Sequence, residues 1–225
     1  LIDACRNIYG YEPDETKTAF PDSGFYKLYD GEVALVFFAG EPGPSYMLGH
    51  AHCDLLSFEL SIKGKPVIVN SGTYAYQSNL RGYFRSTSAH NTATVNDEEQ
   101  MECWAEHRVA RGIRDVRASV VESCCIKASF LNCRNRFHSR ELSLCNDVLT
   151  IKDVFGGKPG RLVSFIHFGP DISMTGDCIS SNGTKNISSY SYSNCIGAKY
   201  SDCHLITIDT DQMILTSTIN LQGIK

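Results

Sequence analysis

The sequence lacks a long hydrophobic run. Its longest strongly apolar stretch, Val33 to Ala39, is far shorter than the roughly 20 residues that a membrane-spanning helix needs. The 225 residues also lack an excess of charge of either sign, with 21 basic and 25 acidic side chains and a formal net charge of −4. We therefore expect neither a membrane nor a nucleic acid as a partner, because nothing in the overall charge attracts a polyanion.

Motifs of several common enzyme classes are absent. No Gly-x-Ser-x-Gly of serine hydrolases occurs, and no Gly-x-Gly-x-x-Gly or phosphate-binding loop of nucleotide-dependent enzymes. No two of the ten cysteines have the Cys-x-x-Cys spacing of zinc ribbons and thioredoxin-type sites. The cysteines are either small buried hydrophobic residues or partners in one or more disulfides, and both interpretations stay open.

Helical periodicity is scarce, and only Leu1–Tyr11 has the pattern of a helical remnant. From Gly24 onward, short runs of β-branched and aromatic residues alternate with Gly, Asn, Asp or Pro, which predicts many short strands. Strands without intervening helices favour an all-β fold, an antiparallel β-sandwich of the supersandwich type. The predicted strands are Tyr26–Tyr29, Val33–Phe38, Leu55–Ile62, Val67–Val69, Thr92–Val95, Val116–Val121, Cys125–Phe130, Phe137–Leu144, Val148–Val154, Leu162–Phe168, His204–Ile208 and Met213–Ser217.

The organisation along the chain indicates one large domain. Lys63-Gly64-Lys65 predicts a tight hairpin, and the Ser-, Asn- and Gly-rich stretch from Ser180 to Asn194 is typical of an exposed loop. We expect residues 1–20 to be a remnant or linker and residues 21–225 to form the sandwich. The chain begins with Leu rather than Met and stops after a strand-like run, so we expect a piece of a longer polypeptide.

Polar and titratable residues concentrate between Gly49 and Asn91. His50 and His52 lie two residues apart, so on an extended segment both rings point to one face, with Asp54 beside them. Asn70 ends the partner strand of the hairpin, and His90 precedes another strand, so both can reach the same place. Such a cluster of nitrogen and oxygen ligands suits Zn²⁺ or another borderline divalent ion, but it equally suits a hydrogen-bonded polar cluster.

Two arginines follow in the same stretch. Arg81 and Arg85 flank Tyr83 at a spacing of two, so on an extended segment all three share a face. The arginine fork recognises carboxylate and sulfate groups with two hydrogen bonds. The alternative is a solvated turn with ordinary surface arginines.

These residues stand in segments that resemble the heparinase II/III-like family. The resemblance is dense from about residue 20 to residue 112 and rests on order and spacing. The matching segments are Phe20-Pro-Asp-Ser-Gly-Phe-Tyr, Gly49-His-Ala-His-Cys-Asp-Leu-Leu-Ser-Phe-Glu-Leu, Gly64-Lys-Pro-Val-Ile-Val-Asn-Ser-Gly-Thr-Tyr, Arg81-Gly-Tyr-Phe-Arg-Ser-Thr-Ser-Ala-His-Asn-Thr and Asp97-Glu-Glu-Gln-Met-Glu-Cys-Trp104.

The resemblance implies a bacterial, exported polysaccharide lyase, periplasmic or secreted, that acts on uronate-containing chains such as heparan sulfate or alginate. Family members pair an N-terminal α/α toroid with a C-terminal β-sandwich, and this chain resembles the sandwich. By the same resemblance His50 faces the substrate cleft, His52 and His90 ligate zinc, and Tyr76, with Tyr83 as the alternative, lines the cleft. The family usually has Asp where this chain has Asn70, and a neutral amide oxygen makes a weaker metal ligand.

The chemistry implied is β-elimination. The enzyme must neutralise the uronate carboxylate, remove the proton on C5 and protonate the departing sugar oxygen. In the family, toroid residues do much of this, so we expect His50 to act as base or carboxylate partner and Tyr76 to position the sugar. Zinc in this family is structural, and we expect the isolated 225 residues to be nearly inactive.

Two other interpretations remain. A cupin-like metalloenzyme also carries His-x-His on a β-sandwich, but Glu59 lies seven residues after His52, which is longer than the usual cupin gap. A non-catalytic domain that binds glycans or serves polysaccharide assembly is the second alternative, and Asn70 is the residue that suggests it. The other histidines, which lie alone on predicted strands, are expected to be structural; they are His107, His138, His167 and His204.

Overall fold

The computed structural model describes residues 6–8, 10, 14, 16–44, 46–105, 107–174 and 177–224. Among these residues no helix has the length and apolar character needed to cross a membrane. Residues 6–8 are helical, and most of the predicted remnant Leu1–Tyr11 lies outside the described residues.

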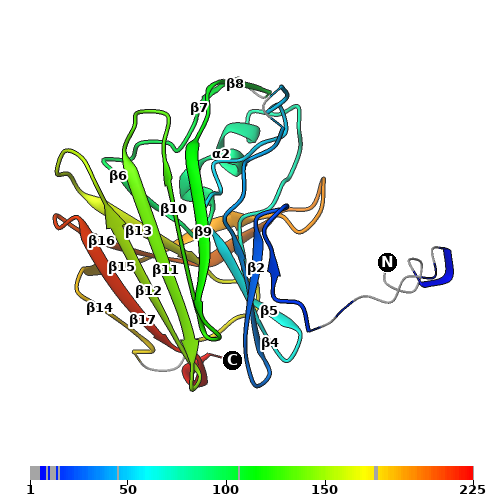
Figure 1. Cartoon of the computed structure of the whole chain (residues 1–225), viewed down its shortest axis with the longest axis vertical. Helices are drawn as coiled ribbons and strands as arrows, with labels where there is room; N and C mark the ends of the chain where they lie inside the picture. The colour runs from blue at the N-terminus through cyan, green and yellow to red at the C-terminus, as the bar shows by residue number, and fades with distance from the viewer. Residues whose placement is uncertain are drawn as a thin grey trace.

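The fold is an all-β antiparallel sandwich, as predicted (Figure 1). Three of its sheets surround one continuous hydrophobic core, which contains for example Leu35, Phe130 and Ile166. The first sheet has the order β1-β2-β3-β4-β5, formed by Ala19–Phe20, Phe25–Asp30, Val33–Phe38, Phe58–Ile62 and Lys65–Ile68.

The two other large sheets consist mostly of strands from the second half of the chain, with β6 added from the first half. One has the order β14-β17-β12-β11-β10-β9, made of Ile179–Ser181, Ile214–Asn220, Val148–Phe155, Phe137–Cys145, Cys125–Leu131 and Arg114–Glu122. The other has the order β15-β16-β13-β6, made of Thr184–Tyr192, Tyr200–Thr210, Leu162–His167 and Ala93–Val95. Every predicted strand is present within a few residues. The hairpin at Lys63 and Gly64 is also confirmed, with positive φ at both residues.

The predicted loop Ser180–Asn194 is wrong. Most of it is β15, which pairs with β16 along nearly its whole length. Side chains on β15 are exposed through its first six residues, so the strand has no alternation of apolar and polar residues for a sequence pattern to detect. Its backbone is held instead by the hydrogen bonds to its neighbour.

A small assembly stands at one end of the sandwich, at the top of Figure 1. It contains the short helix α2, Arg81–Arg85, and a separate two-stranded sheet of β7, Glu102–Trp104, and β8, Arg108–Arg111. The 3-10 turn η1, Thr87–Ala89, follows α2, and a second turn, η2, Leu221–Gly223, ends the described chain. Of the residues that the sequence singled out between Gly49 and Asn91, Arg81, Tyr83 and Arg85 lie on α2, and His90 directly follows η1.

Candidate functional site

The segment from Arg81 to Arg85 is helical, so the predicted extended conformation is wrong. Arg81, Phe84 and Arg85 are all fully buried. An extended segment would point Phe84 to the face opposite Arg81, whereas a helical turn allows all three side chains to be buried together. Arg81 and Arg85 therefore lie one turn apart on the same face. Tyr83 points elsewhere, where its hydroxyl group donates to the Ser191 carbonyl oxygen at 3.2 Å.

A chain of hydrogen bonds connects Arg81 to two histidines. Arg81 Nη1 donates to His52 Nε2 at 2.6 Å, and His52 Nδ1 lies 3.2 Å from His90 Nε2. His90 Nδ1 lies 2.8 Å from the carbonyl oxygen of Ser86, which can only accept. Because arginine can only donate, one proton arrangement satisfies the whole chain: His52 carries its proton on Nδ1 and donates to His90, which donates to Ser86.

Both imidazoles in this chain are neutral near pH 7. Burial lowers the pKa of His52 to about 3, helped by the neighbouring His90 and Arg81. Burial likewise lowers the pKa of His90 to about 4, although its hydrogen bond to Ser86 acts in the opposite direction. A neutral pair agrees with the proton arrangement, in which each ring donates once and accepts once.

The residues predicted to bind zinc do not fit the ion as they are arranged here. A metal between His52 Nδ1 and His90 Nε2 would force the His52 proton onto Nε2, against the Arg81 donor. Asn70 is engaged elsewhere: its Oδ1 accepts from the Asn91 backbone N–H at 2.8 Å, and its Nδ2 donates to Ser57. Among the described residues no three His, Cys, Asp or Glu side chains gather in a metal-binding group. Zinc at His52, Asn70 and His90 is implied by the resemblance alone, whereas this arrangement favours the alternative of a hydrogen-bonded polar cluster.

The cupin-like alternative finds no support at Glu59. This residue lies on β4, where its Oε1 accepts from the Asn70 backbone N–H at 3.2 Å rather than joining the histidines. Burial raises its pKa. A His-His-Glu ligand set is therefore not assembled by the side chains that the structure describes.

His50 and its neighbours form a second, exposed cluster beside the first. The His50 ring lies 5.2 Å from the Tyr76 ring in edge-to-face geometry and 6.3 Å from the His107 ring. The His107 ring is stacked on Tyr76 at 6.5 Å. His50 and His52 thus belong to neighbouring clusters, because the segment turns at Gly49 and His50 instead of running as a strand.

His107 corrects a sequence-based prediction. It does not lie alone on a strand but between β7 and β8, in contact with the rings of His50 and Tyr76. No local pattern pointed to it, because the contact joins residues more than 30 positions apart. Of the other histidines expected to be structural, His138 and His167 are buried and hydrogen-bonded, whereas His204 is exposed on β16.

Arg81 joins the two clusters. Its guanidinium carbon lies 4.9 Å from the centre of the Tyr76 ring, and its Nη2 donates to the His50 carbonyl oxygen at 3.4 Å. Arg81 is fully buried, its Nε has no hydrogen-bond partner, and none of the described residues forms an ion pair with it. The site therefore holds a positive charge that no described carboxylate neutralises.

Arg85 binds the turn that follows β7. It is buried, and its Nη1 donates to the Ala105 carbonyl oxygen at 3.3 Å, in the turn after β7. The alternative of a solvated turn with ordinary surface arginines is wrong, because Arg81 and Arg85 are buried on a helix. Their predicted contact with substrate stays a prediction.

Two cysteines line a cavity behind the histidines. Cys53 and Cys103 lie 3.7 Å apart, sulfur to sulfur, at a cavity of about 400 Å³ that Arg85 and Glu99 also line. The hydrogen bond from Cys53 lowers the pKa of Cys103 to about 7, against the effect of burial. All nine described cysteines are free thiols, which favours the first of the two interpretations of the cysteines.

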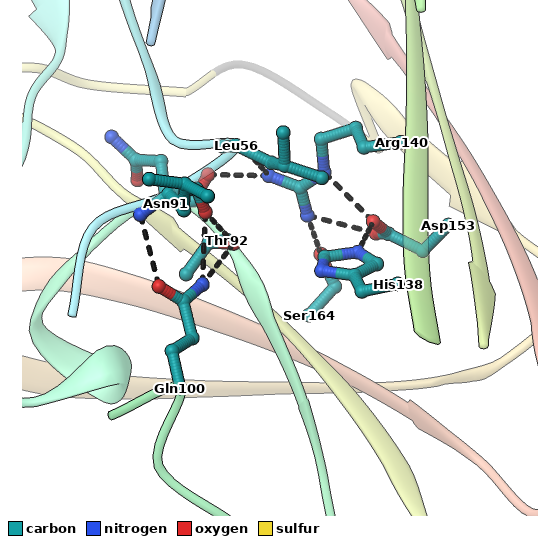
Figure 2. A network of polar contacts seen from close by, with 9 residues as sticks. Leu56, Asn91, Thr92, Gln100, His138, Arg140, Asp153 and Ser164 are labelled. Atoms are coloured by element: carbon teal, nitrogen blue, oxygen red, sulfur yellow. Dashed lines mark hydrogen bonds and ion pairs between the residues drawn. The ribbon is translucent and has the colours of Figure 1, made fainter. Parts of the chain in front are cut away.

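The loops that carry the site are fastened to the sandwich by polar side chains that sequence reasoning did not single out. Figure 2 shows Arg140 of β11 donating to the carbonyl oxygens of Leu56 and Asn91, which follow the two histidine segments. Gln100 accepts from the Leu55 backbone N–H at 2.9 Å and donates to its carbonyl oxygen at 2.8 Å. A buried arginine in a strand is a weak sequence signal, and its partners are far away in sequence.

Comparison with known proteins places this geometry in a family. A model of the Heparinase II/III-like, C-terminal domain matches residues 12–217. A heparin-sulfate lyase of Pedobacter heparinus is 29% identical over 101 residues, which are 41% of this chain and 15% of that protein.

Solved structures agree with the fold. A heparinase III, the BT4657 gene product, superposes with a TM-score of 0.70 at 18% identity over 93% of this chain and 36% of its own. Heparan sulfate lyase HepC from Pedobacter heparinus superposes with a TM-score of 0.70 at 19% identity, over 92% of this chain and 36% of its own. This chain thus spans little more than a third of these structures. Because the family model covers most of its length, the chain belongs to the Heparinase II/III-like family, as a C-terminal domain.

Proposed function

We propose that this chain is the C-terminal domain of a polysaccharide lyase that cleaves uronate-containing glycans of the heparan sulfate type by β-elimination. The observation that carries the proposal is the exposed pair of His50 and Tyr76, whose rings lie 5.2 Å apart, with the Tyr76 ring against the unneutralised Arg81. The pair combines a group that can accept a proton with a phenol that can hydrogen-bond a sugar, next to a positive charge suited to an acidic substrate.

In β-elimination the C5–H and C4–O bonds break and a C4–C5 double bond forms, while negative charge develops on the uronate carboxylate. The protein must therefore remove the C5 proton, stabilise this charge and protonate the departing oxygen. We assign His50 to remove the C5 proton and Tyr76 to position the sugar ring. Arg81, buried beneath Tyr76, supplies a fixed positive charge that stabilises the developing negative charge.

The rest of the machinery is proposed to come from outside this chain. An N-terminal α/α toroid of the same parent protein would close the cleft over His50 and Tyr76 and supply the group that protonates the departing oxygen. We further propose that the parent is periplasmic or secreted, where an acidic polysaccharide is accessible.

The test uses the full-length protein that contains this chain. Incubation with heparan sulfate, and separately with alginate, should produce a 4,5-unsaturated end that absorbs in the ultraviolet, preferentially with heparan sulfate. His50→Ala should lower kcat/KM by about 100-fold or more, because general-base catalysis typically contributes that much. The melting temperature should not change, because His50 is exposed.

A matched control is His204→Ala, which removes an exposed histidine on β16 and should leave turnover unchanged. Unchanged turnover of His50→Ala would refute the assigned role. Binding of heparan sulfate without any unsaturated product would favour the non-catalytic alternative. Robust turnover by the 225 residues alone would show that the toroid is dispensable.

A further inference from the structure

A second cavity adjoins the His50–Tyr76 pair. Its volume is about 410 Å³, within the ordinary range of small-ligand sites. Because Gly49 directly precedes His50 and His107 stacks on Tyr76, the cavity continues the exposed cluster of the site. Its described lining contains basic and aromatic residues and no carboxylate, and it includes Tyr46, Leu48, Gly49, Trp104, His107 and Arg108.

Trp104 is an exposed aromatic residue in the lining of this cavity. Its side chain is 54% exposed, although tryptophan usually buries most of its surface. Its indole N–H donates to Glu102 Oε1 at 3.2 Å, and the same carboxylate is paired with Arg111. The ring is thus held by its edge while it stays exposed, and the nearby acidic group is already neutralised.

The turn after Trp104 is built under strain. Ala105 has a φ of +48°, a left-handed conformation that a non-glycine residue rarely adopts. The buried Arg85 donates to its carbonyl oxygen at 3.3 Å and so holds the turn in place. Because Arg85 lies one turn of α2 from Arg81, one short helix supports both the cavity and the His50–Tyr76 pair. Strain retained in this way is typical of functional segments.

We propose that Trp104, with Tyr46 in the lining of the same cavity, forms a subsite that stacks a pyranose ring of the acidic polysaccharide one or more units away from the bond that is cleaved. The inference rests on the proposed function and adds a binding residue to it. The C–H face of a sugar packs on an aromatic face, and the exposed Arg108 lies where a carboxylate or sulfate of the same sugar can pair with it.

The experiment uses the fact that Trp104 is the single tryptophan of the chain, so tryptophan emission reports on this position alone. Size-fractionated heparan sulfate oligosaccharides are titrated into the 225-residue chain, with calorimetry as an independent measure of binding. We expect a saturable change of emission. Trp104→Ala should weaken binding of the longer oligosaccharides by about tenfold, and Trp104→Phe should retain most of the affinity.

The control is Tyr29→Ala, which removes a similarly exposed aromatic residue on β2 and should leave the affinity unchanged. Calorimetric binding without a change of emission, and with Trp104→Ala equal to the unmodified chain, would overturn the subsite and leave the proposed function standing. Absence of binding by both measures would overturn the subsite, whereas turnover by the full-length protein would still decide the proposed function.

Discussion

Two buried arginines of this molecule have opposite surroundings. Arg140, inside the sandwich, makes two hydrogen bonds of 2.8 Å to the Asp153 carboxylate, and His138 contacts the same group (Figure 2). Arg81, in the small assembly at the end of the sandwich, contacts a histidine, a backbone carbonyl and the Tyr76 ring, and no described carboxylate.

The surroundings of the two arginines indicate that Arg140 stabilises the fold and that Arg81 belongs to the functional site. A buried charge is costly unless it is paired, and Arg140 is paired as completely as the structure allows. Its remaining donors fasten the loops after His52 and His90, so its charge serves the fold. Arg81 leaves its charge unneutralised next to exposed rings, an arrangement that costs stability but suits an anionic ligand. Four predictions test this comparison.

The largest effect is expected at Arg140. Arg140→Met leaves Asp153 buried without its cation and removes the donors to Leu56 and Asn91, so we expect a loss of about 3 to 5 kcal/mol in the free energy of unfolding. Chemical denaturation measures it. Arg161→Met is the control: it removes an exposed pair with Asp209 and should cost about 1 kcal/mol or less. Equal losses of stability in Arg140→Met and Arg161→Met would show that Arg140 stabilises the fold no more than an exposed arginine does.

The buried histidines and the Asp153 carboxylate should lower the stability of the fold in different pH ranges. Burial holds the pKa values of His52, His90 and His167 at about 3, 4 and 3, below 6.5 in the unfolded chain. Between pH 6.5 and 4 the unfolded chain binds protons that the folded chain does not, so stability falls as the pH falls. We expect a loss of about 2 to 4 kcal/mol between pH 7 and 5.

Asp54 opposes this trend, because burial raises its pKa to about 7 and the folded chain then retains a proton. Asp54→Asn should therefore make the loss between pH 7 and 5 larger. At Asp153, burial alone would raise the pKa, but Arg140 and His138 outweigh it and hold the pKa far below its usual range. Protonation of Asp153 should therefore need strongly acidic pH, whereas burial also lowers the pKa of His138, so His138 adds to the loss of stability below pH 6.5. A free energy of unfolding that does not change from pH 7 to 5 in the unmodified chain and in Asp54→Asn would contradict the lowered histidine pKa values.

A small effect on stability is expected at Arg81. Arg81→Met loses the hydrogen bond to His52 but also removes an unpaired buried charge, so the free energy of unfolding should change by about 1 kcal/mol or less. Affinity for heparan sulfate oligosaccharides should nevertheless fall by about tenfold. A loss of stability as large as that of Arg140→Met would show that the two arginines have the same role.

The smallest effect is expected from metal removal. Arg81, His52 and His90 satisfy one another without an ion, so a chelator should leave the melting temperature unchanged, and elemental analysis should find no stoichiometric zinc. One zinc ion per chain, together with a lower melting temperature after chelation, would support the prediction drawn from the family resemblance.

Strand positions were predictable where burial imposes a pattern. Val33–Phe38 was predicted with its observed limits, because alternate side chains enter the core. The edge strand β15 was missed, because its side chains are mostly exposed and its order comes from pairing with β16. The helix Arg81–Arg85 was missed for a related reason: five residues are too few for a helical period to show.

Chemistry-bearing residues were predictable from the sequence by type and by local spacing. The amino-acid order alone placed His50, His52, Asn70, Tyr76, Arg81 and His90 in one region and determined an antiparallel sandwich, because strand periodicity is local. Only the tertiary structure decided that His50 meets Tyr76 and His107, that His52 meets Arg81 and His90, and that Asn70 turns toward Asn91. These contacts join residues 21 to 57 positions apart. Which of the possible contacts form depends on burial and on the satisfaction of hydrogen bonds, and no local sequence pattern contains that information.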